Sequence, residues 1–139
     1  MPGNSLQRFS DIPHIGAAFS GLGPNTAMDG TGTVVLVFTA GANGSRIERG
    51  QALHMGVNNA GMLRFFWNNG TGLPSVAANN SLIEELPMAA NPTLSQAAAS
   101  VPGILQRVPI ILGPSERIYA AVTVTLAAGY QITLFGGNY

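Results

Sequence analysis

The sequence predicts an all-β protein: an eight-stranded antiparallel jelly-roll sandwich with an extended N-terminal arm. Apolar residues alternate with polar ones at the period of two expected of a half-buried strand, and almost no segment has helical periodicity. Eighteen glycines and nine prolines divide the 139 residues into short segments. About eight strands joined by such turns favour a jelly roll, because its two packed sheets protect the unpaired edges of the strands. An immunoglobulin-like sandwich is the alternative fold.

The first 30 residues hold three of the prolines and only fragments of an apolar pattern. We therefore expect an extended arm at 1–30, lying over a neighbouring molecule or over its own sandwich, and a single β domain at 31–139. A weak strand is expected inside the arm at 15–19. A disordered tail is the alternative for this region.

Three strands are expected in the first half of the domain. Segment 33–39 is β-branched and aromatic, which is typical of a strand buried on both faces or central in a sheet. Segment 46–57 is a long strand in which Gly50 marks a bulge or bend. Between them, Asn43-Gly44 predicts a type I′ hairpin turn that would fix the register of both strands. Segment 62–68 places three apolar side chains on one face, with Arg64 and Phe66 on the other.

The second half of the domain predicts four more strands, at 82–86, 104–112, 118–126 and 130–134. Glu84 and Glu85 are neighbours on the first of these, so their side chains should point to opposite sides. The turn 113–116 joins the second strand to the third. Between 87 and 103, the alanines at 93–100 predict a helix of one or two turns, and a long surface loop is the alternative.

Composition excludes several functional classes. Charged residues make up 9% of the chain, against a usual share of about 25%. All six basic residues are arginine, six acids balance them, and cysteine is absent. Without lysine or cysteine there is no P-loop, Schiff base, thiol catalysis or disulfide. A neutral chain is not expected to bind nucleic acid, and its longest apolar run, five residues, predicts no membrane span.

Catalytic patterns are sparse. The two histidines, His14 and His54, do not show the spacing of a metal site, and the nucleophile-elbow pattern does not occur. The adjacent carboxylates of 84 and 85 face apart, unlike a glycosidase pair. We therefore expect no enzyme activity, no metal and no cofactor.

A low charge content also has a positive implication. Neutral proteins with few charges tend to associate, so part of the surface is expected to be covered by another protein. Arginine beside an aromatic ring is typical of interface hot spots. The candidate interface residues are Arg8, Phe9, Phe19, Arg46, Arg49, Arg64, Phe66, Trp67 and Tyr139. The alternatives are that each arginine makes only a local ion pair and that a second layer covers the aromatic ring.

Three segments carry a family resemblance. Residues 39–49 (TAGANGSRIER), 64–71 (RFFWNNGT), and the ending AAGY at 127–130 with GGNY at 136–139 resemble small proteins encoded near the major capsid protein of tailed bacteriophages. The resemblance covers about residues 33–139 and not the first 30. Gly50 departs from it, because a bulky aliphatic residue is expected there.

The resemblance implies a capsid cement, or decoration, protein with a jelly-roll fold. Such a protein would sit on the outside of the phage head, in the virion, after synthesis in the bacterial cytoplasm. Its partners would be the major capsid protein and itself, with a dimer favoured and a trimer as the alternative. A receptor- or carbohydrate-binding domain of a phage fibre is the rival function, with Trp67, Asn68 and Asn69 as its candidate cluster.

Overall fold

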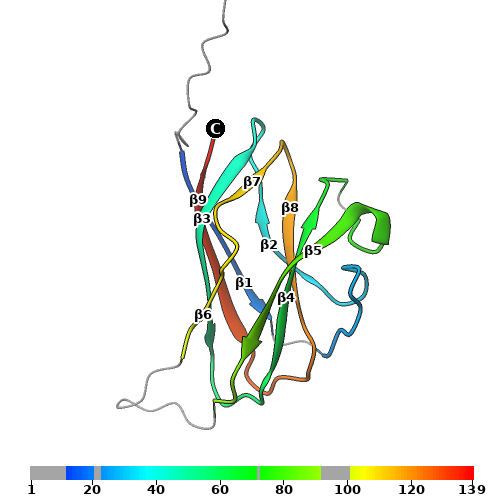
Figure 1. The fold of residues 1–139 in the computed structure, drawn as a ribbon, viewed down its shortest axis with the longest axis vertical. Helices are drawn as coiled ribbons and strands as arrows, with labels where there is room; N and C mark the ends of the chain where they lie inside the picture. Colours follow the sequence, from blue (N-terminus) through cyan, green and yellow to red (C-terminus); the bar gives the residue numbers. More distant parts are fainter. Residues whose placement is uncertain (1–11, 21–22, 72, 92–100) are drawn as a thin grey trace, which may run out of the picture.

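The computed structural model describes residues 12–20, 23–71, 73–91 and 101–139 (Figure 1). In this part of the chain it has nine strands and one 3-10 turn. They are β1 (Ile12–Ser20), β2 (Val35–Thr39), β3 (Ser45–His54), β4 (Gly61–Asn68), η1 (Ala77–Asn79), β5 (Asn80–Met88), β6 (Gly103–Ile104), β7 (Ile110–Leu112), β8 (Arg117–Val122) and β9 (Tyr130–Asn138). The predicted all-β class is confirmed.

The strands form two antiparallel sheets that pack as a sandwich. Sheet A has the order β1-β9-β3-β6, with β7 also paired to β3; sheet B has the order β2-β8-β4-β5. Figure 1 shows the two layers facing each other. Strand β2 lies at an edge of sheet B and its Leu36 is exposed, so the prediction of a strand central in its sheet or buried on both faces was wrong.

The described part of the expected arm belongs to the sandwich. Strand β1 pairs with β9 along its whole length, from Ile12 opposite Asn138 to Ser20 opposite Tyr130. The segment 23–34 then crosses the outer side of sheet B, where the Asn25 N–H donates a hydrogen bond of 2.7 Å to the Val122 carbonyl. Residues 12–20 and 23–34 are therefore packed on the sandwich. Residues 1–11 and the expected helix at 93–100 lie outside the described residues.

A turn is present at 41–44, closed by the hydrogen bond of 3.0 Å from the Gly44 N–H to the Gly41 carbonyl, but its central residues are Ala42 and Asn43 and it does not make a hairpin. Gly44 has φ of +93°, whereas Asn43 is not among the described residues with positive φ, so the turn is not type I′. The strands on either side of it belong to different sheets, β2 to sheet B and β3 to sheet A. The turn carries the chain from one layer to the other, so the expected register between these two strands was wrong.

Strand β3 contains a bulge close to the predicted place. The register with β9 shifts between Ile47 and Arg49, which leaves Glu48 as the extra residue. Gly50 has another role: a Cβ there would lie 2.7 Å from Leu134 Cδ2 and 2.9 Å from Leu105 Cδ2. Close packing against the core, and not the bulge itself, explains why glycine occupies this position.

The expected strand at 104–112 is interrupted, which is why nine strands occur instead of eight. Two residues of β6 pair with β3 at Gln51 and Ala52, and β7 pairs with β3 again at Ser45–Ile47. Between them, Leu105 turns inward and is buried, while Ile104 is exposed. The single alternating face predicted for this segment was therefore wrong.

The main core fills the space between the sheets. Sheet A contributes buried side chains that include Ile47, Ile132 and Leu134, and sheet B contributes Leu63 and Phe65. Full burial of each such side chain is worth about 1.5–3 kcal/mol relative to exposure. The predicted facing of segment 62–68 is confirmed, because Leu63 and Phe65 enter this core while Phe66 lies on the other side of sheet B.

The two long sides of the sandwich differ. On one side β1 closes against β2: a Cβ on Gly16 would lie 2.2 Å from the Val37 carbonyl oxygen and 2.8 Å from Phe38 Cδ2. On the other side an open groove of about 550 Å³ separates β5 from residues 106 and 107. The second side therefore offers a hollow that a partner could enter.

Candidate interaction surfaces

Phe66 is not an exposed interface residue. It is fully buried on the outer side of sheet B, in a second cluster with Tyr119 and Ala121. Val34 and Leu82 pack against this cluster. The prediction that Phe66 forms an exposed hot spot was wrong, and the alternative, that a second layer covers the ring, is what the structure contains.

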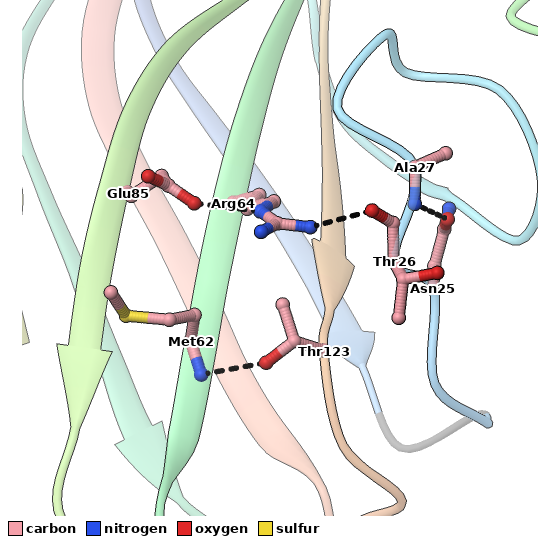
Figure 2. Close-up of polar contacts among 7 residues, drawn as sticks. All are labelled: Asn25, Thr26, Ala27, Met62, Arg64, Glu85 and Thr123. Atoms are coloured by element: carbon pink, nitrogen blue, oxygen red, sulfur yellow. Dashed lines mark hydrogen bonds and ion pairs between the residues drawn. The ribbon is translucent and has the colours of Figure 1, made fainter.

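Arg64 helps to hold that second layer in place. Its Nε donates a hydrogen bond of 2.8 Å to Glu85 Oε1, and its Nη1 donates one of 3.1 Å to the Thr26 carbonyl (Figure 2). Only 13% of the Arg64 side chain is exposed. Arg64 thus connects β4, β5 and the segment 23–34, and its ion pair with Glu85 is the local contact that was expected as the alternative to an external interface.

Trp67 is likewise engaged within the protein. Its ring packs against the main core, and its Nε1 donates a hydrogen bond of 2.8 Å to Glu116 Oε2. Asn68 is fully buried, and its side chain bonds Asn80 and the Gly70 N–H, whereas Asn69 is exposed. These three residues therefore do not form a common exposed cluster for a sugar.

Arg46 and Arg49 do lie on an outer surface. The bulge on β3 turns Arg49 to the side of Arg46 and Glu48, and Arg46 Nε lies 2.5 Å from Glu48 Oε1, with both of these side chains partly exposed. The Arg49 guanidinium carbon stacks over the Phe135 ring at 4.4 Å from its centroid. An exposed ion pair of this kind contributes under about 1 kcal/mol to stability, so these charges remain available for a partner.

The remaining candidates lie at the two ends of the chain. Tyr139 is half-buried, and its N–H donates to the Gly44 carbonyl at 3.1 Å. The backbone of Phe19 pairs with Gln131 in sheet A, and its side chain is outside the described set. Arg8 and Phe9 lie outside the described residues altogether.

The groove beside β5 is lined by Leu82, Ile83, Glu84, Glu85, Gln106 and Arg107. As predicted, the two glutamates differ in direction, because Glu84 is buried and Glu85 is exposed. The Glu84 carboxylate accepts the Gln106 N–H at 2.7 Å and the Arg107 N–H at 3.3 Å. It thus satisfies backbone groups in the gap between β6 and β7.

Neither histidine lines this groove. His14 makes an edge contact with Phe38, with ring centroids 4.6 Å apart. His54 is buried and makes an edge contact with Tyr130 at 5.0 Å. Burial lowers the pKa of His54 below its usual value, opposed by a backbone hydrogen bond with Ala89. Within the described ranges, no three His, Asp or Glu side chains gather as metal ligands would.

Asn58 is a structural residue for which the sequence carries no signal. Its Oδ1 accepts the Ala128 and Gly129 N–H groups at 3.0 and 3.1 Å, and its Nδ2 donates to the Gly129 carbonyl at 2.8 Å. Its backbone also forms an isolated bridge with Asn91. These partners are up to 71 positions away in the chain, so only the fold brings them together.

The helical content of the described ranges is the three residues of η1, and no helix there is long and apolar enough to cross a membrane. No protein-family model and no curated protein matches the chain.

Proposed function

We propose that this chain is a structural virion protein, a capsid cement protein that binds the outside of a bacteriophage head and bridges neighbouring major capsid subunits. The observation that carries the proposal is uncovered apolar surface on a rigid, neutral scaffold. Eleven large hydrophobic side chains are exposed among the described residues, on a chain with only 9% charged residues. Burial of such surface against another protein is the main driving force for association.

The partner is proposed from the family resemblance in three segments, and the first of these segments contributes to the surface that the proposal needs. Arg46, Glu48 and Arg49 are in the first segment, and Phe135 immediately precedes the GGNY ending. Together they form part of the outer face of sheet A. The middle segment contributes Arg64, Phe66 and Trp67, which support the fold internally.

We further propose that the sandwich is a jelly roll. Strands β6 and β7 both pair with β3, so they can be counted as one interrupted strand, which leaves four strands in each sheet. The chain then alternates between the sheets at every step except the β4–β5 hairpin. This order favours a jelly roll over an immunoglobulin-like sandwich, in which several hairpins stay within one sheet.

A cement protein stabilises the head by mass action. Bound copies must leave before the shell can come apart, so their binding free energy adds to the stability of the shell. Many copies on one head make individually weak contacts sufficient, because each shell subunit is then tied to several neighbours. Neither effect requires a catalytic group or a cofactor.

The proposal is tested with heads of the phage that encodes this chain, assembled without it. Purified protein is mixed with these heads, and bound protein is measured by co-sedimentation. We expect saturable binding at a fixed ratio to the major capsid protein, and a higher temperature of DNA release. Heads already carrying the native protein are the control, because their sites are occupied. Binding to host-surface glycans without binding to heads would instead support the fibre-domain alternative and overturn the proposal.

A further inference from the structure

The two outer faces of the sandwich differ in whether another segment of the chain covers them. The outer face of sheet B carries the second apolar cluster, and the segment 23–34 covers it. This segment is held by the Asn25 N–H and by Arg64, whose hydrogen bond to the Thr26 carbonyl is drawn in Figure 2. The outer face of sheet A has no such layer among the described residues. Its exposed side chains include Ile111 at 68%, Ile15 at 61% and Ile104 at 42% relative exposure.

The strand register shows that these residues share one face. Ile15 on β1 lies opposite Phe135 on β9, which in turn lies opposite Arg49 on β3. Ile111 lies opposite Arg46, and Ile104 lies opposite Gln51. Directly opposed residues point to the same side of a sheet. Their chain neighbours, among them Gly16, Leu134 and Leu112, are buried on the inner side. We call this surface, formed by Ile15, Arg46, Glu48, Arg49, Gln51, Ile104, Ile111, Thr133 and Phe135, the A face.

The A face carries charges of both signs. In a regular strand Arg46 and Glu48 would share one side and Arg49 would point to the other, but the extra residue turns Arg49 to the side of Arg46 and Glu48. A face with charges of both signs can pair with the same face of a second copy. Across a twofold axis, Glu48 of each copy can meet Arg49 of the other. The formal net charge of zero means that two copies do not repel each other at long range.

The size of the A face also suits a second copy. Strand β9 has nine residues, about 30 Å of length at about 3.3 Å per residue. Four strand positions across sheet A span about 19 Å, which gives a projected area of about 570 Å². An interface of standard size removes about 800 Å² of accessible surface from each partner. Because side-chain relief makes the accessible area exceed the projection, this face can supply such an interface if most of it is used.

We propose that two copies of this chain pack A face to A face about a twofold axis, as a sheet-on-sheet dimer. The apolar side chains of β1, β6 and β7 then become the buried part of the contact, and Arg49 stacked on Phe135 is its centre. Isologous contacts of this kind are the commonest symmetric interface. The inference does not rest on the cement role, because it concerns only the association of the free protein.

The test begins with the solution mass of the full chain by sedimentation equilibrium, up to about 0.1 mM protein, a range that detects weak dimers. We expect a dimer. Ile111→Asp should weaken it at least tenfold, because it places a charge within the apolar part of the contact. Leu73→Asp is the control, since Leu73 is also exposed, at 58%, but lies between β4 and β5 of sheet B. A thermal melt of each variant verifies that both are folded.

The absence of cysteine allows a second measurement that does not depend on disrupting the contact. A spin label on Gln51→Cys should report a short distance between copies, whereas a label on Ser81→Cys, on β5 of sheet B, should report a much longer one. A monomer throughout the concentration range, a trimer, or a dimer weakened equally by both aspartates would overturn the proposal. Head binding by Ile111→Asp is then measured separately, so failure of the dimer and failure of the cement role are distinguished.

Discussion

The carboxylate of Glu84, on the edge strand of sheet B, accepts the Gln106 N–H at 2.7 Å and so connects the two sheets on the side where the sandwich is open. This contact replaces the ladder hydrogen bonds that are lost where β6 ends. A buried acceptor used in this way is costly to remove, because the backbone donors that it satisfies would lose their partner.

Glu84→Gln should lower the free energy of unfolding by about 1–3 kcal/mol, since the amide keeps only one acceptor oxygen for two N–H donors. Glu85→Gln is the neighbouring control and should cost under about 1 kcal/mol, because its ion pair with Arg64 is partly exposed. Urea unfolding of the two variants measures both values. Equal losses would show that the direction of the Glu84 side chain is unimportant.

Gly16→Ala should destabilise the protein by about 1–3 kcal/mol, because the added Cβ would meet the Val37 carbonyl and force β1 away from β2. Gly23→Ala is the control: a Cβ there meets nothing within 4 Å, so the change should stay within about 0.5 kcal/mol. Thermal and urea unfolding give the comparison. If Gly16→Ala were as stable as Gly23→Ala, the close approach of β1 and β2 would be disproved.

The stability of the protein should fall as the pH drops below about 6.5, the usual pKa of histidine. Burial lowers the pKa of His54 in the folded state, so in this range the unfolded chain takes up the proton more readily and unfolding is favoured. His54→Gln should show a shallower fall between pH 7 and pH 5. Tyr130→Phe keeps His54 and its ring contact and should retain the wild-type slope. Parallel curves for wild type and His54→Gln would contradict the expectation.

Tyr130→Phe should raise the free energy of unfolding by about 1 kcal/mol. The Tyr130 hydroxyl is buried and has no hydrogen-bond partner among the described residues, so its removal relieves a desolvation cost while the ring stays in place.

Burial also raises the pKa of Tyr130, so the folded wild type keeps this proton above pH 10 while the unfolded chain loses it. Stability should therefore decline with pH in that range, and the decline should be smaller in Tyr130→Phe. A less stable variant would mean that the hydroxyl makes a hydrogen bond.

The candidate surface could be predicted only in part. Arg46 and Arg49 were predicted as interface residues, and the structure leaves both at the surface beside exposed apolar side chains. Arg64, Phe66 and Trp67 were predicted on the same composition argument, yet all three are engaged within the chain. Arginine and aromatic residues are used for both purposes, and a local pattern does not show whether a distant segment such as 23–34 lies over them.

The class of the fold, the position of most strands and the core-facing side of β4 could all be predicted from the amino-acid sequence, because a period of two in apolar residues is a local property of the chain. The sequence did not predict which strands share a sheet, that the turn at 41–44 links the two sheets, or that 104–112 divides into β6 and β7. These outcomes depend on partners far apart in the sequence, such as Glu84 with the backbone at 106 and Gly16 with Val37. These contacts stabilise the protein only once both sheets are packed together, so they produce no periodic pattern of apolar residues in the sequence.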